Sequence, residues 1–188
     1  FGVRIAEADA PKWHPDVTFY AITGAGGEPV GSFYVDLYAR ASKRGGAWMD
    51  DAITRRRKGD GIQTPVAYLN CNFSRPVGNR PALFTHDEVI TLFHEFGHAL
   101  HMLLSDAPWP SLASLNVAWD FIEVPSLLNE RWLEDRDLLA RHARHWQTGE
   151  PLWLDVATGT AFRASWRPCP DCASWTRRGA KGLKCLWL

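Results

Sequence analysis

Short apolar runs in the first part of the chain predict β-strands. Residues 17–23 and 30–38 are rich in β-branched and aromatic side chains, and the turn sequence GAGGEP separates them, which predicts a hairpin with a rather long loop. The run PVAYLNCNF at residues 65–73 predicts a third strand. The polar stretch at 40–61 contains the basic run RRRKG. We expect that run to be a solvated loop and not a contact for an acidic ligand or nucleic acid.

The pattern becomes helical towards the middle of the chain. Thr85 and Glu88 form a T-x-x-E capping box, so a helix is expected to begin at about His86. Apolar residues then occupy much of the circumference of this helix, which predicts that it is buried. Its expected end is near Ser105, before Pro108, because the residue that precedes a proline disfavours helical geometry.

A second helical region is expected at residues 119–146, where leucines and tryptophans would give it an apolar face. Pro125 lies near its start, a position that proline tolerates only in a first turn or at a kink. Strands followed by helices predict an α+β fold, and the two helical regions make it mainly helical.

The balance of charge bears on the class of partner, and the cysteine content bears on the compartment. Lys and Arg number 21 against 21 Asp and Glu, so there is no reason to expect nucleic acid or an anionic membrane as a partner. No apolar run approaches the ~18 residues of a membrane span. Cys71 is the only cysteine among the first 150 residues, which favours a reducing compartment over a disulfide framework.

The predicted buried helix carries the motif H-E-x-x-H, as HEFGH at residues 94–98. Residues four apart lie on one helical face, so His94 and His98 can bind one Zn²⁺ at about 2.0–2.1 Å. Glu95 lies about 100° round the helix, where it can reach a metal-bound water as the catalytic base. These polar groups would be costly in an apolar helix without a metal, which disfavours two satisfied core histidines. We expect His101 to pack or hydrogen-bond beside the site.

A catalytic zinc needs a third protein ligand and an open position. The second helical region offers Asp120, Glu123 and Glu130. The apolar neighbours of Glu123 favour an inward orientation, but spacing alone does not separate Glu123 from Asp120. Position 104 is leucine, so the third histidine of H-E-x-x-H-x-x-G-x-x-H is missing, which favours a site of two histidines and one glutamate.

Six segments together resemble the oligopeptidase A and thimet oligopeptidase family of zinc metallopeptidases, from the start of the chain to about residue 152. In chain order they are GSFYVDLYAR (31–40), KRGGAWMDD (43–51), TPVAYLNCNF (64–73), THDEV (85–89), FHEFGHALH (93–101) and VAWDFIEVPS (117–126).

The resemblance implies a zinc-dependent metalloendopeptidase that hydrolyses short oligopeptides by Glu-assisted attack of zinc-bound water. It implies His94, His98 and Glu123 as ligands of one Zn²⁺ per chain and Glu95 as the base. It also implies a thermolysin-like zincin core, with a small β-sheet packed on the active-site helices, and a cytoplasmic location. A peptide would pair with a sheet edge, for which the strand at 65–73 is the expected candidate.

Two other interpretations remain open, namely a truncated, catalytically impaired remnant that binds zinc or peptide, and a structural domain with a chance motif. Family members are several times longer, and the resemblance implies that tyrosine and histidine side chains of a later segment stabilise the oxyanion. Every tyrosine of this chain precedes the motif, so these residues are unassigned here.

The resemblance stops abruptly after residue 152. The segment 153–188 holds three of the four cysteines and four of the ten tryptophans, and it shows neither helical nor strand periodicity. We therefore predict a partial metallopeptidase catalytic domain at residues 1–152 and an atypical tail at 153–188 that is non-native or comes from a shifted reading frame. The C-x-x-C of this tail is not expected to form a zinc site, because a second pair of ligands is missing.

Overall fold

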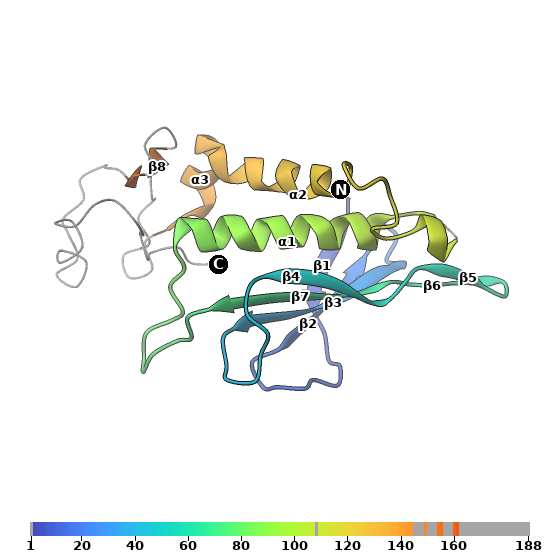
Figure 1. The fold of residues 1–188 in the computed structure, drawn as a ribbon, viewed down its shortest axis with the longest axis horizontal. Coiled ribbons are helices and arrows are strands. Elements are labelled where there is room, and N and C mark those ends of the chain that lie inside the picture. The colour runs from blue at the N-terminus through green and yellow to red at the C-terminus, as the bar shows by residue number, and fades with distance from the viewer. Residues whose placement is uncertain (1, 108, 145–148, 150–153, 156–159, 162–188) are drawn as a thin grey trace. The chain divides into compact units, whose positions relative to one another are not determined.

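The fold is described by a computed structural model (Figure 1), which covers residues 2–107, 109–144, 149, 154–155 and 160–161. The chain divides into two compact units. The first consists of Phe1–Phe73 and Thr91–Asn129, and the second of Ser74–Ile90 and Glu130–Leu188. Each unit is described by itself.

The first unit is built on a five-stranded sheet in the order β1-β2-β3-β7-β4. β3 and β7 are parallel, and the other neighbouring strands are antiparallel. The strands are β1 (Arg4–Glu7), β2 (Thr18–Thr23), β3 (Pro29–Tyr38), β4 (Trp48–Ile53) and β7 (Val66–Phe73). The predicted hairpin is confirmed as β2 and β3, and the predicted third strand is confirmed as β7.

The basic run at residues 55–59 is solvated as expected, since residues 56–59 are exposed, but it is not a loop, because it contains β5 (Arg56–Lys58). The polar stretch at 40–61 also contains β4 and the first residue of β6 (Gly61–Gln63), which pairs with β5 in a separate two-stranded sheet. β4 is an edge strand whose last four residues are exposed, and every residue of β5 is exposed. Edge strands that face water carry polar residues, so their composition is that of a loop.

The central helix is α1 (His86–Leu104), which confirms the predicted start. The capping box is formed as expected, because Glu88 accepts a hydrogen bond from the Thr85 amide and Thr85 Oγ1 accepts one from the Glu88 amide. Figure 1 shows α1 lying along one face of the sheet. Phe96 packs against Phe33 of β3 with ring centroids 5.4 Å apart, so apolar contact joins helix and sheet.

The second helical region is not continuous. It comprises α2 (Glu123–Glu130), η2 (Arg131–Glu134) and α3 (Arg136–His142), and residues 145–146 lie outside the described part of the chain. Pro125 lies in the first turn of α2, as predicted. The expected apolar face is confirmed only in part, because Leu133 and Leu139 are each 3% exposed, whereas Leu127 and Leu128 are 52% and 63% exposed.

The α+β class is confirmed, but a mainly helical chain is not, since strands and helices account for similar numbers of described residues. No described helix is both long and apolar enough to cross a membrane. Within the predicted tail, β8 (Leu154–Asp155) pairs with β9 (Thr160–Ala161). The rest of the tail, with Cys169 and Cys172, lies outside the described residues, so the boundary at 152 stays a prediction.

A buried charged cluster ties β3 to its neighbours. Asp36 is 1% exposed and accepts hydrogen bonds from Arg40, Lys43 and Trp13. Lys43 Nζ also donates to backbone carbonyl oxygens of β3 and β7. Burial by itself would raise the pKa of Asp36, but the donors from Arg40, Lys43 and Trp13 outweigh it and lower that pKa to about 2.

This cluster predicts an acid-sensitive contribution to stability. The folded-state pKa of Asp36 lies below its ordinary 3.8, so the contribution is full above about pH 4 and is lost as the pH falls towards 2. Asp36→Asn should lower the free energy of unfolding at pH 7 by about 3–5 kcal/mol, because it leaves buried cations without their partner.

The free energies of unfolding of the wild type and of Asp36→Asn should approach each other by about 2 kcal/mol between pH 5 and pH 2. Urea denaturation across this range measures the difference. Asp60→Asn, which removes an exposed carboxylate from the β5–β6 turn, is the control and should keep the wild-type profile. A difference that stays constant with pH would contradict the prediction.

Candidate metal centre

Three side chains of the first unit converge on one point. Nε2 of His94 and Nε2 of His98 lie 3.2 Å apart. Oε2 of Glu123 lies 3.3 Å from the first nitrogen and 3.2 Å from the second. Four ligands placed tetrahedrally at about 2.0–2.1 Å from a metal are about 3.3–3.4 Å apart. The three atoms therefore match three corners of such a tetrahedron, and in the described residues no other group of His, Cys, Asp or Glu is brought together in this way.

The two histidines owe their positions to α1. They are one turn apart, and their rings meet edge-on with centroids 4.8 Å apart. Burial lowers the pKa of His98, although the facing carboxylate of Glu123 opposes this effect. The neutral imidazole is the form that binds a metal ion, so burial favours the ligating state of His98.

Glu123 comes from the first residue of α2, and the structure separates it from the other acidic candidate. Asp120 is exposed and lies outside the cluster. The inward orientation that we expected from apolar neighbours is not what places Glu123. Its side chain is 53% exposed, and Phe121 and Val124 beside it are also exposed. Glu130 belongs to the second unit.

Glu95 projects from α1 close to the edge strand β4. Its side chain is largely buried, and the Met49 backbone hydrogen-bonds to its carboxylate. Burial raises the pKa of Glu95, and the charge of Glu123 acts in the same direction, whereas His94 and the Met49 hydrogen bond oppose it. A carboxylate with a raised pKa is better suited to accept a proton near neutral pH than an ordinary one.

His101 lies one turn beyond His98 and is not part of the ligand cluster. Its ring packs edge-on against Phe121, with centroids 6.2 Å apart. This contact agrees with the packing role expected for His101.

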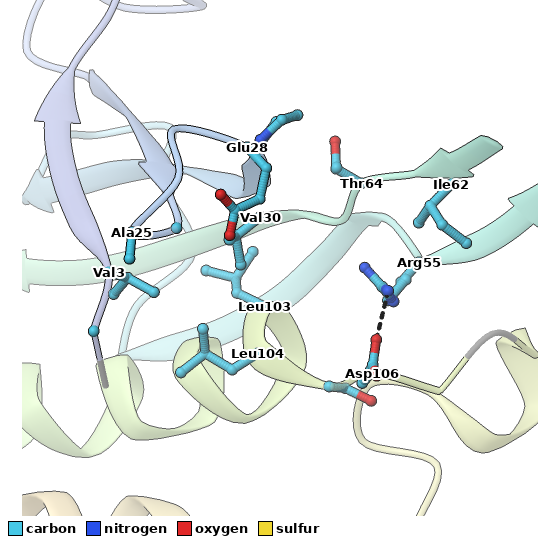
Figure 2. Close-up of a pocket in the computed structure, with 14 residues that line it drawn as sticks. Val3, Ala25, Glu28, Val30, Arg55, Ile62, Thr64, Leu103, Leu104 and Asp106 are labelled. Atoms are coloured by element: carbon cyan, nitrogen blue, oxygen red, sulfur yellow. Dashed lines mark hydrogen bonds and ion pairs between the residues drawn. The ribbon is translucent and has the colours of Figure 1, made fainter.

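A hollow with a volume of about 640 Å³ lies at the C-terminal end of α1 (Figure 2), where Leu103 and Leu104 line it. Arg55 and Asp106 form an ion pair of 2.6 Å at its border. None of the residues that converge at the histidines lines this hollow, so it is separate from the candidate metal centre.

The sequence analysis missed the residues that support Glu123. Ser126 Oγ lies 2.8 Å from Glu123 Oε2, and Asn129 Nδ2 donates to the backbone carbonyl of Phe93. The contact of Ser126 had a signal, because positions three apart face one another on a helix, which pairs Ser126 with Glu123. The contact of Asn129 with Phe93 had none, because it joins two helices that are distant in the sequence. The contact between Met49 and Glu95 had none, because β4 itself was not predicted.

Comparison with known proteins agrees with the resemblance. The model of peptidase family M3 matches residues 1–165. Oligopeptidase A of Escherichia coli K12 is 52% identical over 155 residues, which cover 81% of this chain and 23% of that protein. A probable cytosolic oligopeptidase A of Arabidopsis thaliana is 46% identical over 176 residues (87% and 25%). A dipeptidyl carboxypeptidase of Salmonella typhimurium is 41% identical over 157 residues (83% and 23%). The chain spans about a quarter of the length of these relatives, and it belongs to peptidase family M3.

Proposed function

We propose that this chain is the metal-binding part of a zinc-dependent metalloendopeptidase that hydrolyses short oligopeptides. The observation that carries the proposal is the triangle of donor atoms from His94, His98 and Glu123, with sides of 3.2, 3.2 and 3.3 Å. Membership of peptidase family M3 and relatives named oligopeptidase A support the same activity.

His94, His98 and Glu123 would hold one Zn²⁺ per chain. Two imidazoles and a carboxylate are a common ligand set of catalytic zinc sites, and the spacing of the donor atoms fits it. A bound Zn²⁺ supplies Lewis acidity, which polarises a scissile carbonyl and makes a water more acidic. The expected zincin core would use the same three ligands, which belong to α1 and α2.

Glu95 is proposed as the general base. One of its carboxylate oxygens would take a proton from the attacking water, and the protonated carboxyl would then pass it to the leaving amine. The hydrogen bond with the Met49 backbone restrains the carboxylate, so that less orientation has to be achieved during the reaction.

The expectation that a peptide substrate pairs with the strand at residues 65–73 is wrong. β7, which we expected to pair with a peptide, lies between β3 and β4 and has no free edge. β4 is the edge strand on that side of the sheet, and it contacts Glu95 through Met49. We therefore propose that a peptide substrate pairs with β4, where backbone hydrogen bonds can be made without regard to side chains.

The alternative is a zinc- or peptide-binding remnant with impaired catalysis. It is the second candidate because no side chain among the described residues is assigned as an oxyanion donor. The loss of a single such donor typically costs about 10²–10³ in rate.

Short peptides are the proposed partners, without nucleic acid or membrane. A cytoplasmic location is proposed from the cysteine usage and from the relative named as cytosolic, although another relative is named as organellar.

The metal proposal predicts one zinc per chain. Metal analysis of the purified chain after dialysis should give one equivalent, and His94→Ala should reduce it to a small fraction, because two remaining ligands bind zinc too weakly to retain it through dialysis. His142→Ala removes an exposed histidine from the last turn of α3 and should retain the full equivalent. A wild-type chain that binds no zinc, or a His94→Ala chain that keeps it, would contradict the proposal.

The base proposal predicts that Glu95→Gln separates binding from catalysis. The amide cannot accept the proton, so kcat for a short peptide should fall by about 10²–10⁴, while zinc content stays at one per chain. Glu7→Gln, at an exposed position of β1, serves as the control and should cleave like the wild type. If the wild type holds zinc but cleaves no faster than Glu95→Gln, the remnant interpretation is correct.

A further inference from the structure

α1 and α2 lie close together at Gly97, between the two histidines in the sequence. A Cβ atom at this position would lie 2.6 Å from the Cα of Ser126 and 2.8 Å from the carbonyl oxygen of Pro125. It would also lie 3.1 Å from the Cβ of Asn129. The first two are backbone atoms, which no change of rotamer can move away. Any larger residue at position 97 therefore forces the two helices apart.

Two residues of α2 that lie beside Gly97 make further contacts with their side chains. Ser126 is fully buried, and its Oγ lies 2.8 Å from Oε2 of Glu123 and 2.9 Å from the Glu123 carbonyl oxygen. Asn129 is also buried, and its side-chain amide donates to the carbonyl of Phe93, the residue that precedes His94. One contact thus orients the carboxylate, and the other joins α2 to α1 next to the first histidine.

The Glu123 side chain depends on such support. It is 53% exposed, so surrounding atoms enclose it only in part. α2 has eight residues, and an isolated helix of that length is marginal in water. The position of its first residue is therefore set by the contacts that α2 makes with α1.

We propose that Gly97, Ser126 and Asn129 are positioning residues that place the Glu123 carboxylate at the third corner of the metal centre. Gly97 permits the short distance between the helices, Asn129 fixes the position of α2 along α1, and Ser126 orients the oxygen that faces the histidines. The inference rests on the proposed metal function, and it concerns how tightly the metal is held.

The test measures zinc affinity by competition with a chelator of known affinity. Gly97→Ala and Ser126→Ala should each weaken zinc binding by about 10–100-fold, the usual effect of changes to groups that orient a ligand. The matched controls are Gly45→Ala, where a Cβ meets nothing within 4 Å, and Ser74→Ala, at an exposed position. Both controls should bind zinc like the wild type.

The decisive comparison repeats both substitutions in a Glu123→Ala background, where direct titration with zinc measures the weak binding to the two remaining histidines. Positioning residues act through Glu123, so neither substitution should weaken zinc binding further once the carboxylate is gone. A general loss of packing would instead weaken binding by the same factor in both backgrounds, and that result overturns the proposal. Zinc affinities unchanged by Gly97→Ala and Ser126→Ala overturn it as well.

Circular dichroism of the metal-free variants reports whether each of them folds. If Gly97→Ala does not fold, Ser126→Ala decides, because it removes only one oxygen atom. If the wild type binds no zinc, the proposed metal function itself fails. If the wild type binds zinc and loses it in His94→Ala, but the Ser126→Ala cycle is additive, only the positioning role fails.

Discussion

The close approach of α2 to α1 at Gly97 is the constraint on which the candidate metal centre depends. His94, Glu95 and His98 share a helix, so the distances among them follow from helical geometry. Glu123 is 25 residues further along the chain than His98, and only tertiary contact brings it to the histidines. A glycine in a helix interior costs about 1 kcal/mol relative to alanine, and here it provides the space that this contact requires.

The accuracy of the sequence predictions follows the distance over which the relevant interactions act. α1 was predicted at its first residue because the signals are local, namely a capping box and an apolar repeat. The hairpin of β2 and β3 was predicted for the same reason. The motif in α1 likewise defines its own geometry, since residues four apart share a face whatever surrounds the helix.

The predictions that failed concern features that depend on contacts between residues distant in the sequence. β4 and β5 carry polar residues because they lie at exposed edges, and the sequence of an edge strand resembles that of a loop. Asp120 precedes α2 and Glu123 begins it. Because contacts with α1 set the position of this short helix, the sequence alone could not show which of the two carboxylates faces the histidines. Its apolar neighbours were no guide, since Phe121 and Val124 are exposed.

The proposed base is supported from the sheet as well as from the helix. The Met49 backbone of β4 hydrogen-bonds to the Glu95 carboxylate, so the orientation of this carboxylate depends on the position of β4. The segment that leads into β4 is held by Asn72, whose side-chain amide donates to the carbonyl oxygens of Arg44 and Gly46, and by Lys43 in the Asp36 cluster. Polar residues of β7 and of the segment before β4 therefore anchor the edge strand beside the carboxylate. The metal centre and the base thus draw on different supports, because α2 places the third ligand while the sheet restrains the proton acceptor.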